Sequence, residues 1–114
     1  MGEPMTQERL EKYIGLETEI ACLEEVAQDS AELKELKAER ATILAAIAAL
    51  PDPWERVVLR RRYLETDSDT GQIQMWTVVA LKLYGNDEER HVKAAKRLHK
   101  SALRHLAEKE KSHP

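Results

Sequence analysis

The stretch RHVKAAKRLHKSALRH, residues 90–105, combines a helical pattern with a concentrated positive charge. It contains six Lys or Arg residues, three His and no acidic residue. Because an α-helix turns by about 100° per residue, the basic side chains fall within an arc of about 120°. The apolar side chains fall within an adjoining arc of about 140°. The spacing therefore predicts a helix that packs one face on a core and presents cations on the next face.

Two interpretations of this basic strip are open: a solvated face of an ordinary helix, or the electrostatic footprint of a helix that binds DNA. The strip consists of Arg90, Lys93, Lys96, Arg97, Lys100 and Arg104. On the second interpretation, Lys93, Lys96, Arg97 and Lys100 face DNA. Arg104 then contacts a phosphate, and Arg90 either contacts DNA or pairs with Asp87 or Glu89.

The composition favours a small all-α protein. The chain has 114 residues, 42% of them hydrophobic, with 4% aromatic residues and no Phe. Four Gly and four Pro leave long stretches unbroken, which suits helices. The longest apolar run, residues 41–50, is too short to cross a membrane. A single cysteine, Cys22, cannot form a disulfide framework or a zinc finger, so we expect a buried thiol in a cytoplasmic protein.

Residues 1–50 form an acidic, coiled-coil-like segment, with 5 basic and 11 acidic side chains. Apolar residues at helical spacing predict helices over about 6–27 and 31–50. A tight turn at Asp29 and Ser30 would join them into a hairpin, and one long kinked helix is the alternative. These helices carry more apolar surface than one pair can bury. They should therefore pack on the C-terminal part or form a homodimer through residues 6–50.

The sequence Pro51-Asp52-Pro53 marks the start of the second part, residues 51–114. Pro51 ends the preceding helix. Asp52 as N-cap, Pro53 at the first helical position and Glu55 two residues later predict a well-capped helix over about 54–64. This part carries 13 basic and 10 acidic side chains, so it can approach nucleic acid where the acidic part cannot.

The rest of the chain has the order of a helix-turn-helix unit. A polar loop over 66–74 should precede a short helix over 75–84, which Gly85 ends as a C-cap. Asn86 or Asp87 should then cap the basic helix over 87–110. With the helix over 54–64, these elements predict a three-helix unit in which the last helix enters a major groove. Thr77, at the start of the short helix, is a further candidate phosphate contact.

Several segments of this unit resemble region four of bacterial sigma factors, and more closely the small phage and prophage regulators built on that region. The resemblance spans residues 48–107 and rests on five segments: Leu50-Pro51-Asp52-Pro53, Glu55 to Leu59, Arg62-Tyr63, Trp76 to Ala80, and Arg97-Leu98-His99 with Ala102-Leu103. It implies a DNA-binding transcription regulator with a helix-turn-helix domain and an N-terminal coiled-coil-like segment. It also implies RNA polymerase as a further partner.

Two features depart from that family pattern. Residues 65–75 form a longer connection after the Arg-Tyr pair, and extra residues lie around 86–90. If those extra residues extend the last helix, Asp87, Glu88 and Glu89 lie near the tip that would read bases. This acidic cluster favours phosphate contacts over base recognition.

Other residues have simpler structural interpretations. Trp54 and Trp76 should anchor their helices in the core, and His99 should be packed and hydrogen-bonded. At least one of Arg60, Arg61 and Arg62 should be tied down internally. The pattern contains no catalytic grouping, no metal-ligand set and no cofactor motif. We therefore expect a non-enzymatic regulator that binds double-stranded DNA, with a protein-interaction module contacting RNA polymerase or another phage protein as the alternative.

Overall fold

A computed structural model describes residues 5–65 and 73–111, and within these ranges the chain is all-helical, as the composition predicts. Side chains are described to residue 108. The elements are α1 (Gln7–Glu11), α2 (Tyr13–Val26), α3 (Ala31–Ala48), α4 (Pro53–Leu59), the π-helical turn η1 (Arg60–Leu64), α5 (Trp76–Tyr84) and α6 (Glu89–Lys111). Most of the polar loop expected over 66–74 lies outside the described residues.

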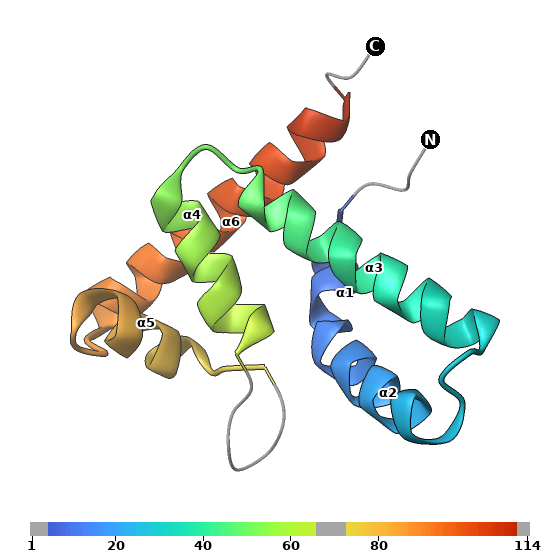
Figure 1. Cartoon of the computed structure of the whole chain (residues 1–114). Coiled ribbons are helices and arrows are strands. Elements are labelled where there is room, and N and C mark those ends of the chain that lie inside the picture. The colour runs from blue at the N-terminus through green and yellow to red at the C-terminus, as the bar shows by residue number, and fades with distance from the viewer. Residues whose placement is uncertain (1–4, 66–72, 112–114) are drawn as a thin grey trace.

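The N-terminal helices form a hairpin rather than one long helix, with α2 and α3 side by side (Figure 1). The side chain of Ser30 caps α3 by accepting from the Leu33 amide at 3.1 Å. The helix expected over 6–27 is interrupted by a turn at Lys12, so that α1 and α2 are separate. Ion pairs then join the two arms of the hairpin, among them Arg9–Glu39 at 2.6 Å and Arg40–Glu17 at 3.1 Å.

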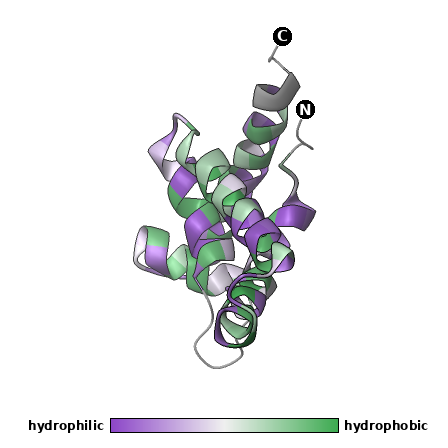
Figure 2. Cartoon of the chain, turned by 45° about the vertical axis from the view of Figure 1, so that its right-hand side comes forward, coloured by the Kyte–Doolittle hydropathy of each residue, from purple (hydrophilic) through white to green (hydrophobic). Residues whose placement is uncertain are grey.

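One hydrophobic core joins the hairpin to the C-terminal helices, as the excess apolar surface of residues 6–50 predicts. Buried residues of this core come from both halves of the chain: Met5, Leu10, Tyr13, Ile43, Ile47, Leu50, Val58, Leu59, Tyr63, Val79, Ala95, Ala102 and Leu106. Helix α6 packs on α4 and α5 (Figure 1). Hydrophobic segments face the places where the helices meet, and hydrophilic segments face outward (Figure 2).

Helix α4 begins as the sequence indicates. The Asp52 carboxylate accepts from the Trp54 amide at 2.8 Å, and Pro53 occupies the first turn. The expectation that Glu55 helps to cap the start of this helix is wrong, because its carboxylate accepts from Ser101 and His105 of α6 instead. The helix expected over 54–64 also changes character after Leu59: a π-helical turn, with the Glu65 amide bonded to the Arg60 carbonyl, follows it.

The connection between α5 and α6 depends on Gly85. This residue has φ 84°, a left-handed conformation that ends α5 as expected, and its amide donates to the Leu81 carbonyl. Helix α6 begins at Glu89, two residues later than predicted. The Asn86 side chain instead accepts from the Glu88 amide at 3.2 Å and holds the turn before the helix.

Two predictions of buried side chains are wrong. Trp54 is 51% exposed, because the start of α4 lies at the surface, where its ring stacks on Tyr84. Cys22 is exposed, because it lies on the side of α2 that faces away from α3. Within the described residues, no helix has the length and apolar character needed to cross a membrane.

The two described glycines give a matched test of this fold. Replacing Gly85 with Ala should lower the free energy of unfolding by about 1–2 kcal/mol, because an L-residue is strained at positive φ. Replacing Gly15, a helical residue with open space around it, should raise it by up to about 1 kcal/mol. Urea unfolding followed by circular dichroism measures both changes. Equal effects at the two positions would contradict the assigned turn.

Candidate nucleic-acid interface

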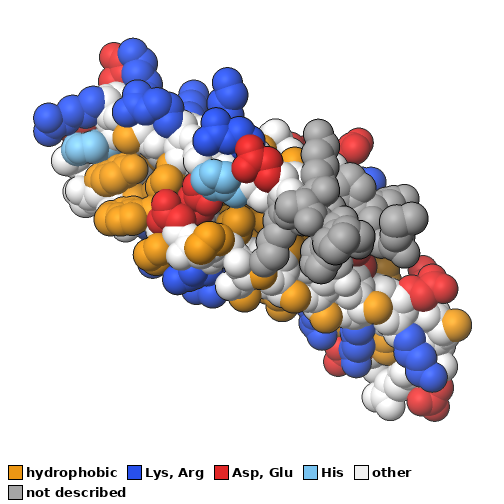
Figure 3. Space-filling view, turned by 90° about the horizontal axis from the view of Figure 1, so that it is seen from above, with side chains coloured by type: hydrophobic (Ala, Val, Ile, Leu, Met, Phe, Trp, Pro, Cys, Tyr) orange, Lys and Arg blue, Asp and Glu red, His pale blue; other side chains and the backbone are white. Residues whose placement is uncertain are grey.

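All six residues of the basic strip lie on α6, and all six are exposed. In Figure 3, Lys and Arg side chains gather along one edge of the molecule, at the end formed by α4, α5 and α6. The opposite side of α6 is buried, with Ala95, Ala102 and Leu106 in the core. The basic strip therefore faces away from the body of the protein, as the arc of charges predicts.

Acidic neighbours divide the strip into paired and unpaired cations. Arg90 pairs with Glu88 at 2.8 Å rather than with Asp87 or Glu89, and Lys93 pairs with Glu89 at 3.2 Å. At the other end, Arg104 and Glu108 lie 3.9 Å apart. Exposed pairs of this kind contribute little stability, but they reduce the local positive charge.

The centre of the strip remains available to a ligand. Lys96, Arg97 and Lys100 have no ion pair with any residue whose side chain the structure describes. These three cations lie within two turns of α6, so they form the strongest uncompensated positive charge on the helix. The acidic residues 87–89 offset the positive charge at the first turn of α6. The uncompensated positive charge therefore lies toward the middle of the helix.

A buried aromatic cluster fixes the position of α6 on the core. The Tyr63 hydroxyl and His99 Nε2 are hydrogen-bonded inside the core, and the Trp76 and His99 rings are in T-shaped contact with 4.9 Å between their centroids. The expectation that His99 is packed and hydrogen-bonded is confirmed. Burial, with a smaller contribution from the Arg62 charge, lowers the pKa of His99 to about 4. Burial also raises the pKa of Tyr63 to about 12.

Arg62 connects this cluster to the start of α5. Its guanidinium lies 4.4 Å from the centre of the Trp76 ring and donates to the Gln74 carbonyl. The Gln74 amide in turn donates to the Arg62 carbonyl at 3.2 Å. At least one residue of the Arg60–Arg62 triplet is thus tied down internally, as expected: Arg62 makes these contacts, and Arg61 pairs with Glu65 at 2.8 Å. The Nε atom of Arg62 is buried without a described hydrogen-bond partner.

A second anchor between α4 and α6 was not predicted. Glu55 is 2% exposed, and its carboxylate accepts hydrogen bonds from the Ser101 hydroxyl and from His105 Nδ1, each at 2.8 Å. The four-residue spacing of Ser101 and His105 places both on one face of α6, and this spacing is the only signal in the sequence. It does not identify Glu55 as their partner.

Thr77 lies on α5 and so is not part of the strip on α6. It is exposed in the first turn of α5, where Met75 as N-cap provides no side-chain hydrogen bond. Among the described residues, no hydrogen bond joins Thr77 to a cation of α6. The structure therefore brings Lys96, Arg97 and Lys100 together on α6 and leaves Thr77 on a neighbouring helix.

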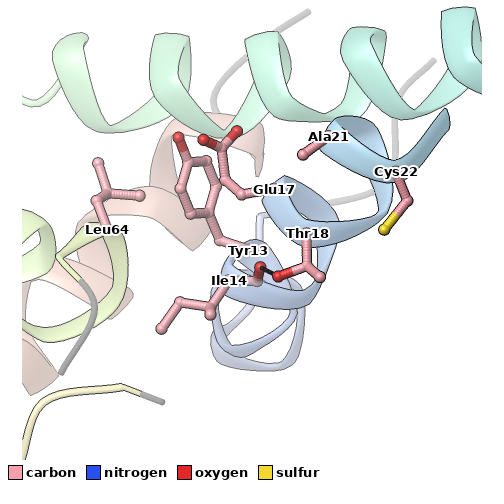
Figure 4. A pocket seen from close by; sticks show the side chains of 7 residues that line it. All are labelled: Tyr13, Ile14, Glu17, Thr18, Ala21, Cys22 and Leu64. Carbon is pink, nitrogen blue, oxygen red and sulfur yellow. Dashed lines mark hydrogen bonds between the residues drawn. The ribbon is translucent and has the colours of Figure 1, made fainter. Parts of the chain in front are cut away.

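A groove of about 430 Å³ runs along α2, lined by Tyr13, Ile14, Glu17, Thr18, Ala21, Cys22 and Leu64 (Figure 4). In this groove the Thr18 hydroxyl is bonded to its own helix, at the Ile14 carbonyl. The described part of the chain contains no group of three or more His, Cys, Asp or Glu side chains placed to hold a metal ion.

Comparisons with known proteins give no assignment: no family model, no curated protein and no solved structure matches this chain.

The buried His99 predicts a pH-dependent stability. Its pKa is about 4 in the folded chain against 6.5 for a free imidazole, so the unfolded chain binds the proton more tightly. The contribution of His99 is therefore fully present above about pH 6.5 and is lost as the pH falls toward 4, by about 3 kcal/mol in all.

Urea unfolding measured between these pH values tests this expectation. The variant His99→Gln, which keeps a hydrogen-bond acceptor for Tyr63, should show a flatter dependence on pH than the natural chain. Identical pH slopes in the two proteins would show that His99 does not lose its proton on folding.

Proposed function

We propose that this chain binds double-stranded DNA through the basic strip of α6 and acts as a transcription regulator. The observation that carries the proposal is the set of three exposed cations without ion pairs, Lys96, Arg97 and Lys100, on the side of α6 that faces away from the core. Phosphate groups attract such a surface regardless of base sequence, because each neutralised phosphate releases condensed counterions. The resemblance to phage regulators of the sigma region-four type agrees with this function.

The charge distribution favours phosphate contacts over base recognition. Glu88 and Glu89 pair with Arg90 and Lys93 in the first turn of α6, the part of a recognition helix that usually reaches base edges. The unpaired cations lie further along the helix. We therefore propose that α6 lies in a major groove with its central cations on the flanking phosphates, and that base recognition contributes less.

A homodimer through residues 6–50 would extend this mode of binding. Two strips related by a twofold axis can contact half-sites about one DNA turn apart. The α2 face that carries Cys22 and the groove of Figure 4 is the exposed side of the hairpin on which such pairing would occur.

A second candidate function is a protein-interaction module that contacts RNA polymerase or another phage protein. Its support is an exposed apolar patch at the start of α4, where Trp54 is 51% exposed. A groove of about 280 Å³ lies beside Trp54, lined by Pro53, Val57, Lys82 and Leu83. Exposed apolar surface of this kind is typical of contacts with a partner. This patch and the basic strip involve different residues, so one chain can have both functions.

Salt dependence tests the phosphate contacts. If about three phosphates are neutralised, raising the salt from about 50 to about 200 mM should weaken binding about forty-fold. Fluorescence anisotropy of a labelled duplex gives the dissociation constant at each salt concentration. An affinity that does not change across this range would contradict the proposed contacts.

Charge reversal tests the location of the interface. The double variant Arg97→Glu, Lys100→Glu should bind DNA at least about tenfold more weakly and with a reduced salt slope. A matched control is Lys12→Glu, Lys34→Glu, which makes the same change in net charge at two exposed residues of the hairpin. Gel shift with the upstream DNA of the gene, together with circular dichroism of both variants, separates binding from folding. Equal losses in the two variants would mean that only net charge matters.

A further inference from the structure

Two glutamates lie on the same side of α6 as the basic strip, one at each end of it. Glu89 precedes the strip and Glu108 follows it. At about 100° per residue, both fall within the arc of about 120° that holds the cations of the strip. Their side chains are 83% and 62% exposed, so neither holds α6 on the core. Their position on the cationic side therefore calls for an explanation other than packing.

The interaction of a carboxylate with the helix dipole accounts for only one of these glutamates. Glu89 lies in the first turn of α6, where a negative charge stabilises the helix, but Glu108 lies in the last turn, where it does not. The two residues instead share an oppositely charged neighbour four positions away. Glu89 Oε1 is 3.2 Å from Lys93 Nζ, and Glu108 Oε1 is 3.9 Å from Arg104 Nε.

These ion pairs shorten the part of the strip that carries uncompensated charge. From residue 93 to residue 104 the helix axis advances by about 16 Å. The central cations, which have no described ion pair, are Lys96, Arg97 and Lys100, and they span only about 6 Å of the axis. Arg90, before them, pairs with Glu88 at 2.8 Å. A phosphate backbone that follows the strip thus meets uncompensated cations only along this central part.

We propose that Glu89 and Glu108 limit the length of the DNA contact, so that the central cations alone neutralise phosphates. An exposed ion pair is weak, so a phosphate can displace the carboxylate from its cation. The displaced carboxylate stays within about one turn of that cation, and its charge repels the phosphate. Each glutamate therefore offsets the attraction of the cation beside it. This inference rests on the proposed DNA binding.

Removing both carboxylates tests the inference by a gain of binding. The double variant Glu89→Gln, Glu108→Gln keeps the size of both side chains and frees Lys93 and Arg104. With about five phosphates neutralised instead of about three, raising the salt from about 50 to about 200 mM should weaken binding about 500-fold, against about forty-fold for the natural chain. At about 50 mM salt the variant should bind at least about tenfold more tightly. Anisotropy of a labelled duplex measures both quantities, and circular dichroism checks that the variant remains helical.

The matched control is Glu32→Gln, Glu35→Gln, which makes the same change in net charge on α3. Both glutamates are exposed and have no described ion pair, and Glu32 lies in the first turn of its helix as Glu89 does. This control should keep the salt dependence of about forty-fold. If both double variants gain the same affinity with an unchanged salt dependence, the glutamates of α6 act only through net charge and the inference is wrong.

A variant without a change in net charge gives a second test. Adding Lys93→Gln and Arg104→Gln to the double variant of α6 removes both members of each pair and leaves the central cations. It should bind within about twofold of the natural chain and with the same salt dependence. A larger loss would show that Lys93 and Arg104 contact DNA despite their partners, and would overturn this inference while leaving DNA binding in place. Absence of binding by the natural chain would instead overturn the proposed function.

Discussion

The rest of the structure depends on one constraint: which side of α6 faces the core and which side faces solvent. A helix that carries cations on one side is useful only if that side is kept out of the core. Small apolar residues bury the opposite side, but they tolerate some rotation and sliding. The hydrogen bonds of His99 with Tyr63 and of His105 with Glu55 are directional, and they hold α6 from two sides. Together they orient Lys96, Arg97 and Lys100 toward solvent.

These anchors show where prediction from sequence succeeds and where it fails. Asp52 and Gly85 act within a few residues of their own positions, so their predicted capping roles follow from local chemistry. The arc of basic side chains on α6 could also be predicted, because it follows from the spacing of residues within one helix. Glu55 could not be assigned correctly, since its partners lie 46 and 50 residues away and an acid near a helix start has a satisfactory local explanation.

The wrong predictions of burial for Trp54 and Cys22 have a related cause. Residue type predicts burial only on average, and the geometry of the whole fold decides which part of an apolar face is covered. Trp54 lies at the very start of α4, beyond the reach of the core, and Cys22 lies on the side of α2 away from α3. One error concerns the end of a helix and the other concerns the uncovered side of a helix. The central core positions of the same helices, Val58 and Ile20, are buried.

The position of the basic strip on α6 suggests a reason for the acidity of the N-terminal half. A protein with cations on every face would bind a polyanion in many orientations, and most of them would be unproductive. Here residues 1–50 carry 5 basic and 11 acidic side chains, whereas Lys96, Arg97 and Lys100 gather on α6 without described ion pairs. Repulsion between the hairpin and phosphate would disfavour any approach that brings α2 or α3 toward the duplex. In the proposed binding mode, the same charge that weakens overall attraction would favour an orientation in which α6 meets DNA first.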